Sequence, residues 1–268
     1  MPSPQILLFQ TTDPASLKKR LLRFRAAFLR LGPNYQFAAV SFIPGTKTEV
    51  RKLVLDGVQV DHYVFSQDAV DTLGYPNKGA TRPFKLIPGN CDLIALLFRK
   101  AAPHFEQYWF IEDDVEYSGD VYQLFNSLAG RDGDLLATHL AHGHDDWTYS
   151  SMLRSPNEKV RPADTWLVFL TFFRISGTAL DTIDRYYRDG GTYVADEDRK
   201  KHYYGLLNNG FMKNGSFGTM DIRLFAGRRK NVLWHPVKQP KVWARQNGKR
   251  LMSIARWHMS KLGLRVLP

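Results

Sequence analysis

Short apolar segments, separated by polar residues, recur along the first two thirds of the chain. Runs rich in branched and aromatic residues predict strands. They cover residues 5–10, 35–43, 58–65, 107–111, 134–140 and 166–175. Leu17, Leu21, Phe24, Phe28 and Leu31 are spaced as on one face of a helix, which predicts a helix between the first two strands.

Residues that favour helix starts lie between the predicted strands. Asp13 suits an N-cap and Pro14 suits the first position of the first helix. A second helix is predicted over residues 91–102. Ser176 predicts the cap of a third helix, which runs to about Asp189 before two glycines close it.

This alternation of strands and helices predicts an α/β fold. We expect a Rossmann-like, mostly parallel sheet flanked by helices, with right-handed crossovers. Ligands of such sheets bind at the carboxyl ends of the strands, so polar residues that directly follow a strand are the first candidates for a site.

Composition narrows the class of protein. The chain is 44% hydrophobic and 24% charged, which is ordinary globular composition and excludes wholesale disorder. Its longest unbroken apolar run, 93–98, is far shorter than the roughly 20 residues of a transmembrane helix. Residues 1–5 have no basic start, so we expect no secretory signal. Cys91 is the single cysteine, which excludes an internal disulfide, and together these features predict a cytoplasmic protein.

The charge balance is basic. Lys and Arg outnumber Asp and Glu by 37 to 26, which gives a formal net charge of +11. Such a surface attracts nucleic acid, anionic lipid or phosphorylated substrates. Many cytosolic enzymes are simply basic, however, so the charge alone does not choose among these partners.

The most informative segment is an acidic triplet, Glu112-Asp113-Asp114, which follows the apolar run Tyr108–Ile111. Three adjacent carboxylates at a strand end repel one another unless a cation lies among them. Oxygen ligands suit hard divalent ions such as Mg²⁺ or Mn²⁺, which commonly complete their shell with phosphate oxygens and water. The alternative interpretation is an acidic turn on the surface.

A hydrophobic strand that runs into a D-x-D-type triplet resembles the glycosyltransferases with the GT-A fold. The later segment Trp234-His235-Pro236-Val237-Lys238 strengthens the resemblance, because metal-dependent members of that fold often have a late histidine at the metal. The resemblance covers roughly residues 5–240, so we expect a catalytic domain over 1–240 and a separate tail over 241–268. It implies a nucleotide-sugar donor, most often a uridine diphosphate sugar.

The resemblance also assigns the metal ligands, for Mn²⁺ or Mg²⁺. Glu112 and Asp114 match the outer positions of the motif, with glutamate where the pattern has aspartate. His235 matches the late ligand. Asp113 is placed towards the ribose or the metal shell, and Lys238 towards the diphosphate. A bound metal would neutralise the charge that develops on the leaving diphosphate.

Further residues are candidates for the donor site. Thr11 and Thr12 follow the first predicted strand, where the GT-A fold binds the base and ribose; their alternative role is helix capping. Arg82, Lys85 and Asp92 flank the helix before the triplet and are candidates for contacts with the donor.

A histidine-rich segment, residues 139–147, provides the acceptor-side candidates. In the glycosyltransferase interpretation, Trp147 stacks on a sugar face, and Asp145 or Asp146 binds sugar hydroxyls. In isolation, His142-x-His144-x-Asp146 resembles the signature of metallo-β-lactamase-type hydrolases, although Trp147 replaces its last histidine. A plain polar loop is the third possibility.

An inverting transferase needs a carboxylate that deprotonates the acceptor hydroxyl. Asp196 and Glu197 are the main candidates, with Asp146 as a third. The first two equally suit a solvated turn, and a retaining enzyme would need no such base. The residues do not decide between the two mechanisms.

The segment after residue 240 has a different character. One face of a predicted helix carries Leu251, Met252, Ala255, His258, Met259 and Leu262, and basic residues surround the rest. A basic amphipathic helix suits an anionic membrane interface, with about 1 kcal/mol per basic residue; the alternative is packing on the domain. Membrane binding would predict a peripheral protein on the inner face, with a lipid-linked saccharide or lipopolysaccharide precursor as acceptor.

Three function classes therefore compete. The leading hypothesis is a metal-dependent glycosyltransferase that acts on a saccharide or lipid-linked saccharide in cell-surface polysaccharide synthesis. A metal-dependent hydrolase or phosphotransferase would use the same acidic cluster with His142, His144 and Asp146. A nucleic-acid binder is disfavoured, because no recognisable binding module is present and an acidic triplet does not suit such a surface.

Overall fold

The structure is a computed structural model. It describes residues 3–78, 92–143, 161, 163, 165–191, 203–206, 209–211, 231–235 and 237. The chain divides into two compact units. Unit 1 comprises Met1–Asp113 and Val121–Leu207, and unit 2 comprises Asp114–Asp120 and Asn208–Pro268. Each unit therefore contains two separate segments of the chain.

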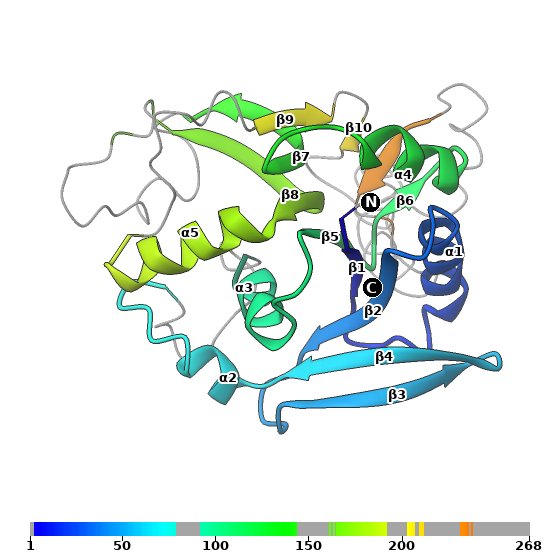
Figure 1. Cartoon of the computed structure of the whole chain (residues 1–268), viewed down its shortest axis with the longest axis horizontal. Coiled ribbons are helices and arrows are strands. Elements are labelled where there is room, and N and C mark those ends of the chain that lie inside the picture. Colours follow the sequence, from blue (N-terminus) through cyan, green and yellow to red (C-terminus); the bar gives the residue numbers. More distant parts are fainter. Residues whose placement is uncertain are drawn as a thin grey trace, which may run out of the picture. The chain divides into compact units, whose positions relative to one another are not determined.

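Unit 1 is built on a mixed sheet with the strand order β3-β4-β2-β1-β5-β8-β7-β9 (Figure 1). The strands are β1 (Gln5–Gln10), β2 (Tyr35–Phe42), β3 (Glu49–Leu55), β4 (Val58–Phe65), β5 (Gln107–Glu112), β7 (Leu135–His142), β8 (Trp166–Ser176) and β9 (Tyr203–Leu206). The central strands β4, β2, β1 and β5 are all parallel. The Rossmann-like α/β fold expected from the sequence is confirmed.

Two strands run against this parallel core. β8 pairs antiparallel with both β5 and β7, although the sequence pattern gave no direction for it. β3, which the apolar pattern did not predict, pairs antiparallel with β4 at the edge of the sheet. The turn between β3 and β4 is Asp56-Gly57, with φ angles of 49° and 80°, as a tight hairpin requires.

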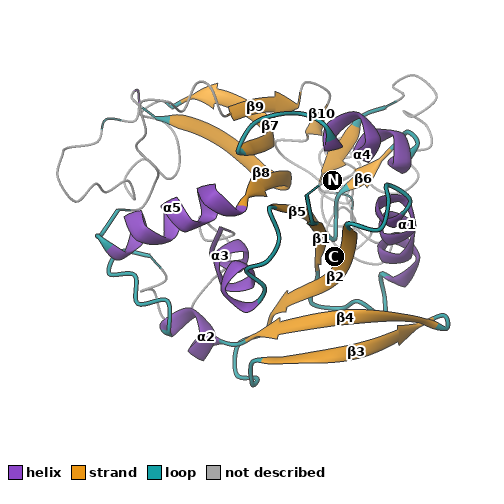
Figure 2. Cartoon of the chain, in the orientation of Figure 1, coloured by secondary structure: helices purple, strands orange, loops and turns teal. Residues whose placement is uncertain are grey.

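Helices cover both faces of the sheet (Figure 2). They are α1 (Lys18–Leu29), α2 (Gln67–Asp71), α3 (Asp92–Ala101), α4 (Val121–Ala129) and α5 (Gly177–Arg188). The predicted start of α1 was wrong: the helix begins at Lys18, and Asp13 instead accepts a hydrogen bond from the Ser16 amide at 3.1 Å in the preceding turn. Ser176 caps α5 as predicted, because its side chain accepts from the Ala179 amide.

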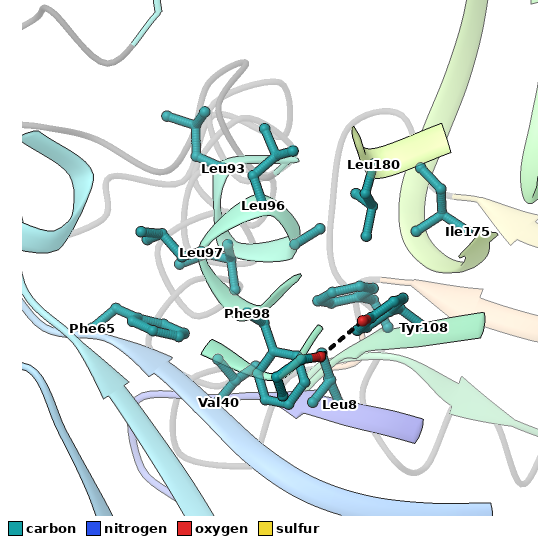
Figure 3. Close-up of a cluster of buried hydrophobic side chains, with 14 of the residues drawn as sticks. Leu8, Val40, Phe65, Leu93, Leu96, Leu97, Phe98, Tyr108, Ile175 and Leu180 are labelled. Carbon is teal, nitrogen blue, oxygen red and sulfur yellow. Dashed lines mark hydrogen bonds between the residues drawn. The ribbon is translucent and has the colours of Figure 1, made fainter. Parts of the chain in front are cut away.

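One face of the sheet packs against α3 and α5. The even-numbered strand residues Leu8, Val40, Tyr108 and Phe110 meet the apolar side of α3, which is buried from residue 93 to residue 98. Figure 3 shows this cluster, including Tyr108, whose hydroxyl donates to the Ala102 carbonyl at 2.8 Å. The alternation of side chains in β1 and β5 therefore gives the sheet two separate apolar faces.

The opposite face carries an aromatic core under α1 and α4. Trp109 lies between the rings of Phe28 and Phe125, with centroids 5.8 Å and 5.6 Å away and near-perpendicular planes. Phe9 and Phe24 extend the cluster, at 6.4 Å. All five side chains are fully buried. Edge-to-face pairs of this kind stabilise a core beyond their buried area, by about 0.5–1.5 kcal/mol per pair.

A buried arginine ties the end of α4 to β8. Arg174 is 2% exposed, and its guanidinium donates to the carbonyls of Leu128, Ala129, Arg131 and Gly133. These carbonyls include the unsatisfied acceptors at the C-terminus of a helix, where the helix dipole also favours a cation. The charge is therefore buried with partners.

Unit 2 contains a small sheet with the order β10-β11-β6. Its strands are β6 (Glu116–Tyr117), β10 (Asn209–Phe211) and β11 (Leu233–His235). β6 pairs antiparallel with β11, and the Ser118 amide donates to the Val232 carbonyl at 3.1 Å. The short segment 114–120 is thereby held against residues that come more than a hundred positions later.

Candidate functional site

The carboxyl ends of β1 and β5 form the edge of unit 1 at which a ligand is expected. The two strands are parallel neighbours, and Gln10 pairs with Glu112 at the last position of their register. Thr11 and Thr12 leave β1 at the same edge as Asp113 leaves β5. The structure therefore brings the threonines and the start of the acidic triplet together, as parallel strands require.

Thr11 is fixed by its backbone as much as by its side chain. It is 3% exposed, its amide donates to the Val40 carbonyl at 2.9 Å, and its hydroxyl accepts from the Asp13 amide at 3.1 Å. Its carbonyl accepts from the Ser41 hydroxyl. Thr12 is exposed. Of the two predicted donor contacts, Thr11 is thus an anchored residue, and Thr12 is the one open to a ligand.

A buried polar chain, which the sequence analysis did not identify, leads to Thr11. Ser41 and His62 are each 1% exposed, and Ser41 Oγ lies 2.6 Å from His62 Nε2. Arg51 Nε donates to His62 Nδ1 at 3.3 Å. Burial, with the Arg51 charge as a second cause, lowers the pKa of His62 to about 4. His62 is therefore neutral at physiological pH.

The acidic triplet begins in unit 1. Glu112 is the last residue of β5 and is half-buried. The Asp113 carbonyl accepts a hydrogen bond from the Arg20 guanidinium of α1. A cationic side chain of α1 therefore lies against the backbone at the end of β5.

The triplet ends in unit 2 beside a histidine. His235 Nε2 lies 3.0 Å from Asp114 Oδ1, with the two side chains 19% and 15% exposed. The Val237 amide donates to the Asp114 carbonyl at 2.6 Å, and Trp234 pairs with Glu116 across the β11–β6 ladder. The strand pairing places this carboxylate and this imidazole together, although they come from distant parts of the sequence.

The donor set fits a divalent cation. Asp114 and His235, both in unit 2, each offer a ligand atom. Ligand atoms in neighbouring positions of an octahedron, each about 2.1 Å from the ion, lie about 3 Å apart. The observed 3.0 Å separation matches that spacing. Mixed oxygen and nitrogen ligands suit Mn²⁺, which lies between the carboxylate preference of Mg²⁺ and the imidazole preference of later metals.

Asp92, a predicted donor contact, has partners within unit 1. It begins α3, forms an ion pair with Lys78 at 3.0 Å and accepts from the Tyr187 hydroxyl of α5. Lys78 in turn lies 5.0 Å from the centre of the Tyr187 ring. These contacts give Asp92 a role in joining α3 to α5. They leave its predicted contact with a donor as a prediction.

Several predicted site residues lie outside the described residues. They are Arg82, Lys85, His144, Asp145, Asp146, Trp147, Asp196, Glu197 and Lys238, together with the whole tail 241–268. His142 lies in β7, where its backbone pairs with Trp166. The acceptor side, the candidate base and the basic tail therefore stay predictions from the sequence.

Comparisons with known proteins give structural neighbours only. The sequence matches no protein-family model, and no curated protein matches it. Among solved structures, the galactosyltransferase LgtC, in complex with donor and acceptor sugar analogs, covers 98% of this chain and 97% of its own at 11% identity and a TM-score of 0.42. A glycosyltransferase involved in the glycosylation of the major capsid of PBCV-1 aligns with 87% of this chain and across 92% of its own length, at 10% identity and a TM-score of 0.39. Mouse xyloside xylosyltransferase 1 aligns with 87% of this chain and across 97% of its own length, at 9% identity and a TM-score of 0.38.

Within the described ranges, no helix is both long enough and apolar enough to cross a membrane.

Proposed function

We propose that the protein is a metal-dependent glycosyltransferase that transfers a sugar from a nucleotide diphosphate donor, with uridine diphosphate as the first candidate nucleotide. The observation that carries the proposal is the 3.0 Å approach of Asp114 and His235, a carboxylate and an imidazole that two strands hold together. Asp114 belongs to the acidic triplet that begins at the last residue of β5, a buried strand in the parallel core of the sheet.

Glu112, Asp114 and His235 are proposed to hold Mn²⁺ or Mg²⁺. Glu112 is included because only Asp113 separates it from Asp114 in the chain. The bound ion would neutralise the negative charge that develops on the diphosphate as the glycosidic bond breaks. Lys238 follows His235 by three positions and is proposed as a further cation for the diphosphate.

The nucleoside is proposed to bind at the carboxyl ends of β1 and β5. The pairing of Gln10 with Glu112 supports this location, since it places Thr12 and Asp113 at one edge. Thr12 is exposed there, whereas the Asp113 carbonyl already accepts a hydrogen bond from the Arg20 guanidinium. The chain would thus bind the nucleoside with residues that directly follow β1 and β5, and the diphosphate with Lys238 and the metal bound by the acidic triplet.

The acceptor side of the proposal rests on the sequence. Trp147 and Asp145 are proposed to bind a saccharide, and Glu197, Asp196 or Asp146 to take the proton of its hydroxyl. A lipid-linked acceptor, and peripheral attachment through the basic tail, remain proposals of the same kind. They predict binding to vesicles with anionic lipid, which weakens as salt screens the charges.

Calorimetric titration tests the proposed function. Wild type is titrated with uridine diphosphate in the presence and absence of Mn²⁺, and the Asp114→Asn and His235→Ala variants follow. Asp68→Asn, which changes an exposed carboxylate of α2, is the matched control. We expect binding that requires Mn²⁺, is lost in both site variants and is retained in the control.

Three outcomes are distinguishable. Preference for guanosine or cytidine diphosphate would keep the transferase and change its donor. Mn²⁺ binding without affinity for any of the three nucleotides would favour the metal-dependent hydrolase. Nucleotide binding that is unaffected by Asp114→Asn would refute the assigned metal ligands.

A further inference from the structure

Buried polar groups in unit 1 form a chain that the proposed metal chemistry does not use. Ser41 lies in β2 between Val40 and Phe42, and His62 lies in β4. Both side chains are 1% exposed. Burying polar groups costs free energy unless each finds a partner, and apolar residues would fill such positions without that requirement. The arrangement therefore calls for an explanation beyond packing.

The hydrogen bonds of this chain run in one direction. Arg51 Nε is a donor, so His62 Nδ1 accepts, and the neutral ring carries its proton on Nε2. His62 Nε2 then donates to Ser41 Oγ, and the Ser41 hydroxyl donates to the Thr11 carbonyl. Arg51 is an always-charged donor at one end, and a backbone carbonyl is the acceptor at the other. We call these three consecutive hydrogen bonds, from Arg51 through His62 and Ser41 to Thr11, the Arg51–Thr11 relay.

The relay ends where the regular pairing of β1 with β2 stops. The register between the two strands ends at Gln10 and Val40, and the Thr11 amide makes one further bond to the Val40 carbonyl. The Thr11 carbonyl, which follows, is taken by the Ser41 side chain rather than by a backbone amide. The side chain thus sets the direction of the peptide that joins Thr11 to Thr12.

Fixing that carbonyl also fixes the next amide. In a trans peptide, the carbonyl of one residue and the N–H of the next point in opposite directions. With the Thr11 carbonyl held against β2, the Thr12 N–H points away from Ser41. Thr12 is exposed at the carboxyl end of β1. Its amide is therefore a preoriented donor at the edge where the nucleoside is proposed to bind.

We propose that Ser41, His62 and Arg51 are positioning residues, which hold the Thr11–Thr12 peptide so that the Thr12 amide can donate to an oxygen of the nucleoside. This inference rests on the proposed function. None of the three residues contacts the nucleotide itself. The gain in nucleotide affinity comes from preorganisation, because the peptide loses its conformational freedom on folding rather than on binding.

Paired substitutions separate positioning from stability. Ser41→Ala removes the donor to the Thr11 carbonyl, and His62→Leu removes both ring nitrogens. His62→Gln keeps one acceptor and one donor and is the conservative rescue. Ser66→Ala is the matched control, because Ser66, which directly follows β4, is also buried, and its hydroxyl lies 2.8 Å from Thr48 Oγ1 rather than on the Thr11 carbonyl.

The first assay is calorimetry with the nucleoside diphosphate that wild type prefers, in the presence of Mn²⁺. We expect Ser41→Ala and His62→Leu to weaken binding about tenfold, which corresponds to one lost hydrogen bond of ordinary strength. His62→Gln should restore affinity to within about twofold of wild type. Ser66→Ala should lower the melting temperature as Ser41→Ala does, with no change in nucleotide affinity.

The second assay needs no ligand. Imidazole ¹⁵N and ¹H resonances of wild type should show a neutral His62 ring protonated on Nε2, without titration between pH 5 and pH 8. A ring protonated on Nδ1 would overturn the relay. Equal nucleotide affinity in wild type and Ser41→Ala would overturn its positioning role. If wild type binds none of the three nucleotides, the proposed function fails and the assignment to a nucleoside fails with it, whatever the resonances show.

Discussion

The buried histidine predicts how the stability of the protein depends on pH. The pKa of His62 is lowered to about 4 in the folded state, against an ordinary value of 6.5. As the pH falls below 6.5, the unfolded chain takes up a proton at this residue before the folded chain does. Stability is therefore full above pH 6.5 and is lost progressively as the pH falls toward 4.

The size of this loss follows from the two pKa values. Between pH 7 and pH 5, the difference in proton binding at His62 amounts to about 2 kcal/mol of unfolding free energy. The groups around the His62 ring explain why its pKa is lowered rather than raised. Arg51 adds a positive charge beside Nδ1, while Ser41 and the surrounding strands exclude water from the protonated form. No carboxylate forms a hydrogen bond or ion pair with this ring in the part of the chain that the structure describes.

Urea denaturation at a series of pH values measures the effect. Wild type is compared with His62→Gln, which keeps one hydrogen-bond acceptor and one donor but cannot take up a proton. The difference between the two proteins removes the contributions of the other histidines and of the carboxylates. We expect wild type to lose about 2 kcal/mol more than His62→Gln between pH 7 and pH 5. Parallel pH profiles for the two proteins would refute the reasoning.

Three further substitutions test the fold. Ser176→Ala removes the cap of α5 and should lower the free energy of unfolding, measured by urea denaturation, by about 1 kcal/mol. An unchanged urea midpoint would show that the cap does not stabilise the fold. Gly57→Ala places a side chain at φ 80° and should cost about 1 kcal/mol, with Gly57→Asn closer to wild type; equal losses would contradict the turn assignment. Phe28→Ala should cost about 3–5 kcal/mol and lower the melting temperature by several degrees, and a loss below 1 kcal/mol would mean that the aromatic core repacks.

The central strands could be predicted because their residues are buried on both faces, as in β1, or on alternate positions, as in β4. β1 and β4 begin and end at the predicted residues, since continuous apolar or alternating runs mark them. β3 was missed because it lies at the sheet edge, where Val50 and Val54 are 58% and 72% exposed and charged residues interrupt the pattern. Most of the residues of β3 are exposed on both faces, so packing imposes no apolar pattern on this strand.

The capping prediction at Asp13 failed for a local reason. Aspartate also stabilises turns, and Asp13 bonds to Ser16 within the turn that precedes α1. A short-range pattern cannot distinguish these two uses, because the same side-chain oxygen accepts from an amide a few residues later in both.

The candidate site was predictable in part. The triplet at residues 112–114 was visible because its residues are adjacent, and His235 was found through the family resemblance. Ser41 and His62 were missed because no motif links them and each is a single polar residue in an apolar run. That signal was present in the sequence: a serine in AAVSF and a histidine in VDHYVF interrupt segments that are otherwise suited to burial.

The discontinuous composition of unit 2 has a consequence for the order in which the protein is made. Ser118 and Val232, which bond in this unit, are 114 positions apart in the sequence. A ribosome that adds about 5–20 residues per second would release the first segment many seconds before its partner strand exists. During that interval the Asp114 carboxylate has no imidazole beside it. If the proposed metal site is correct, selective cation affinity arises late in synthesis, and nascent chains stalled before His235 carry a largely formed sheet without the complete set of proposed ligands.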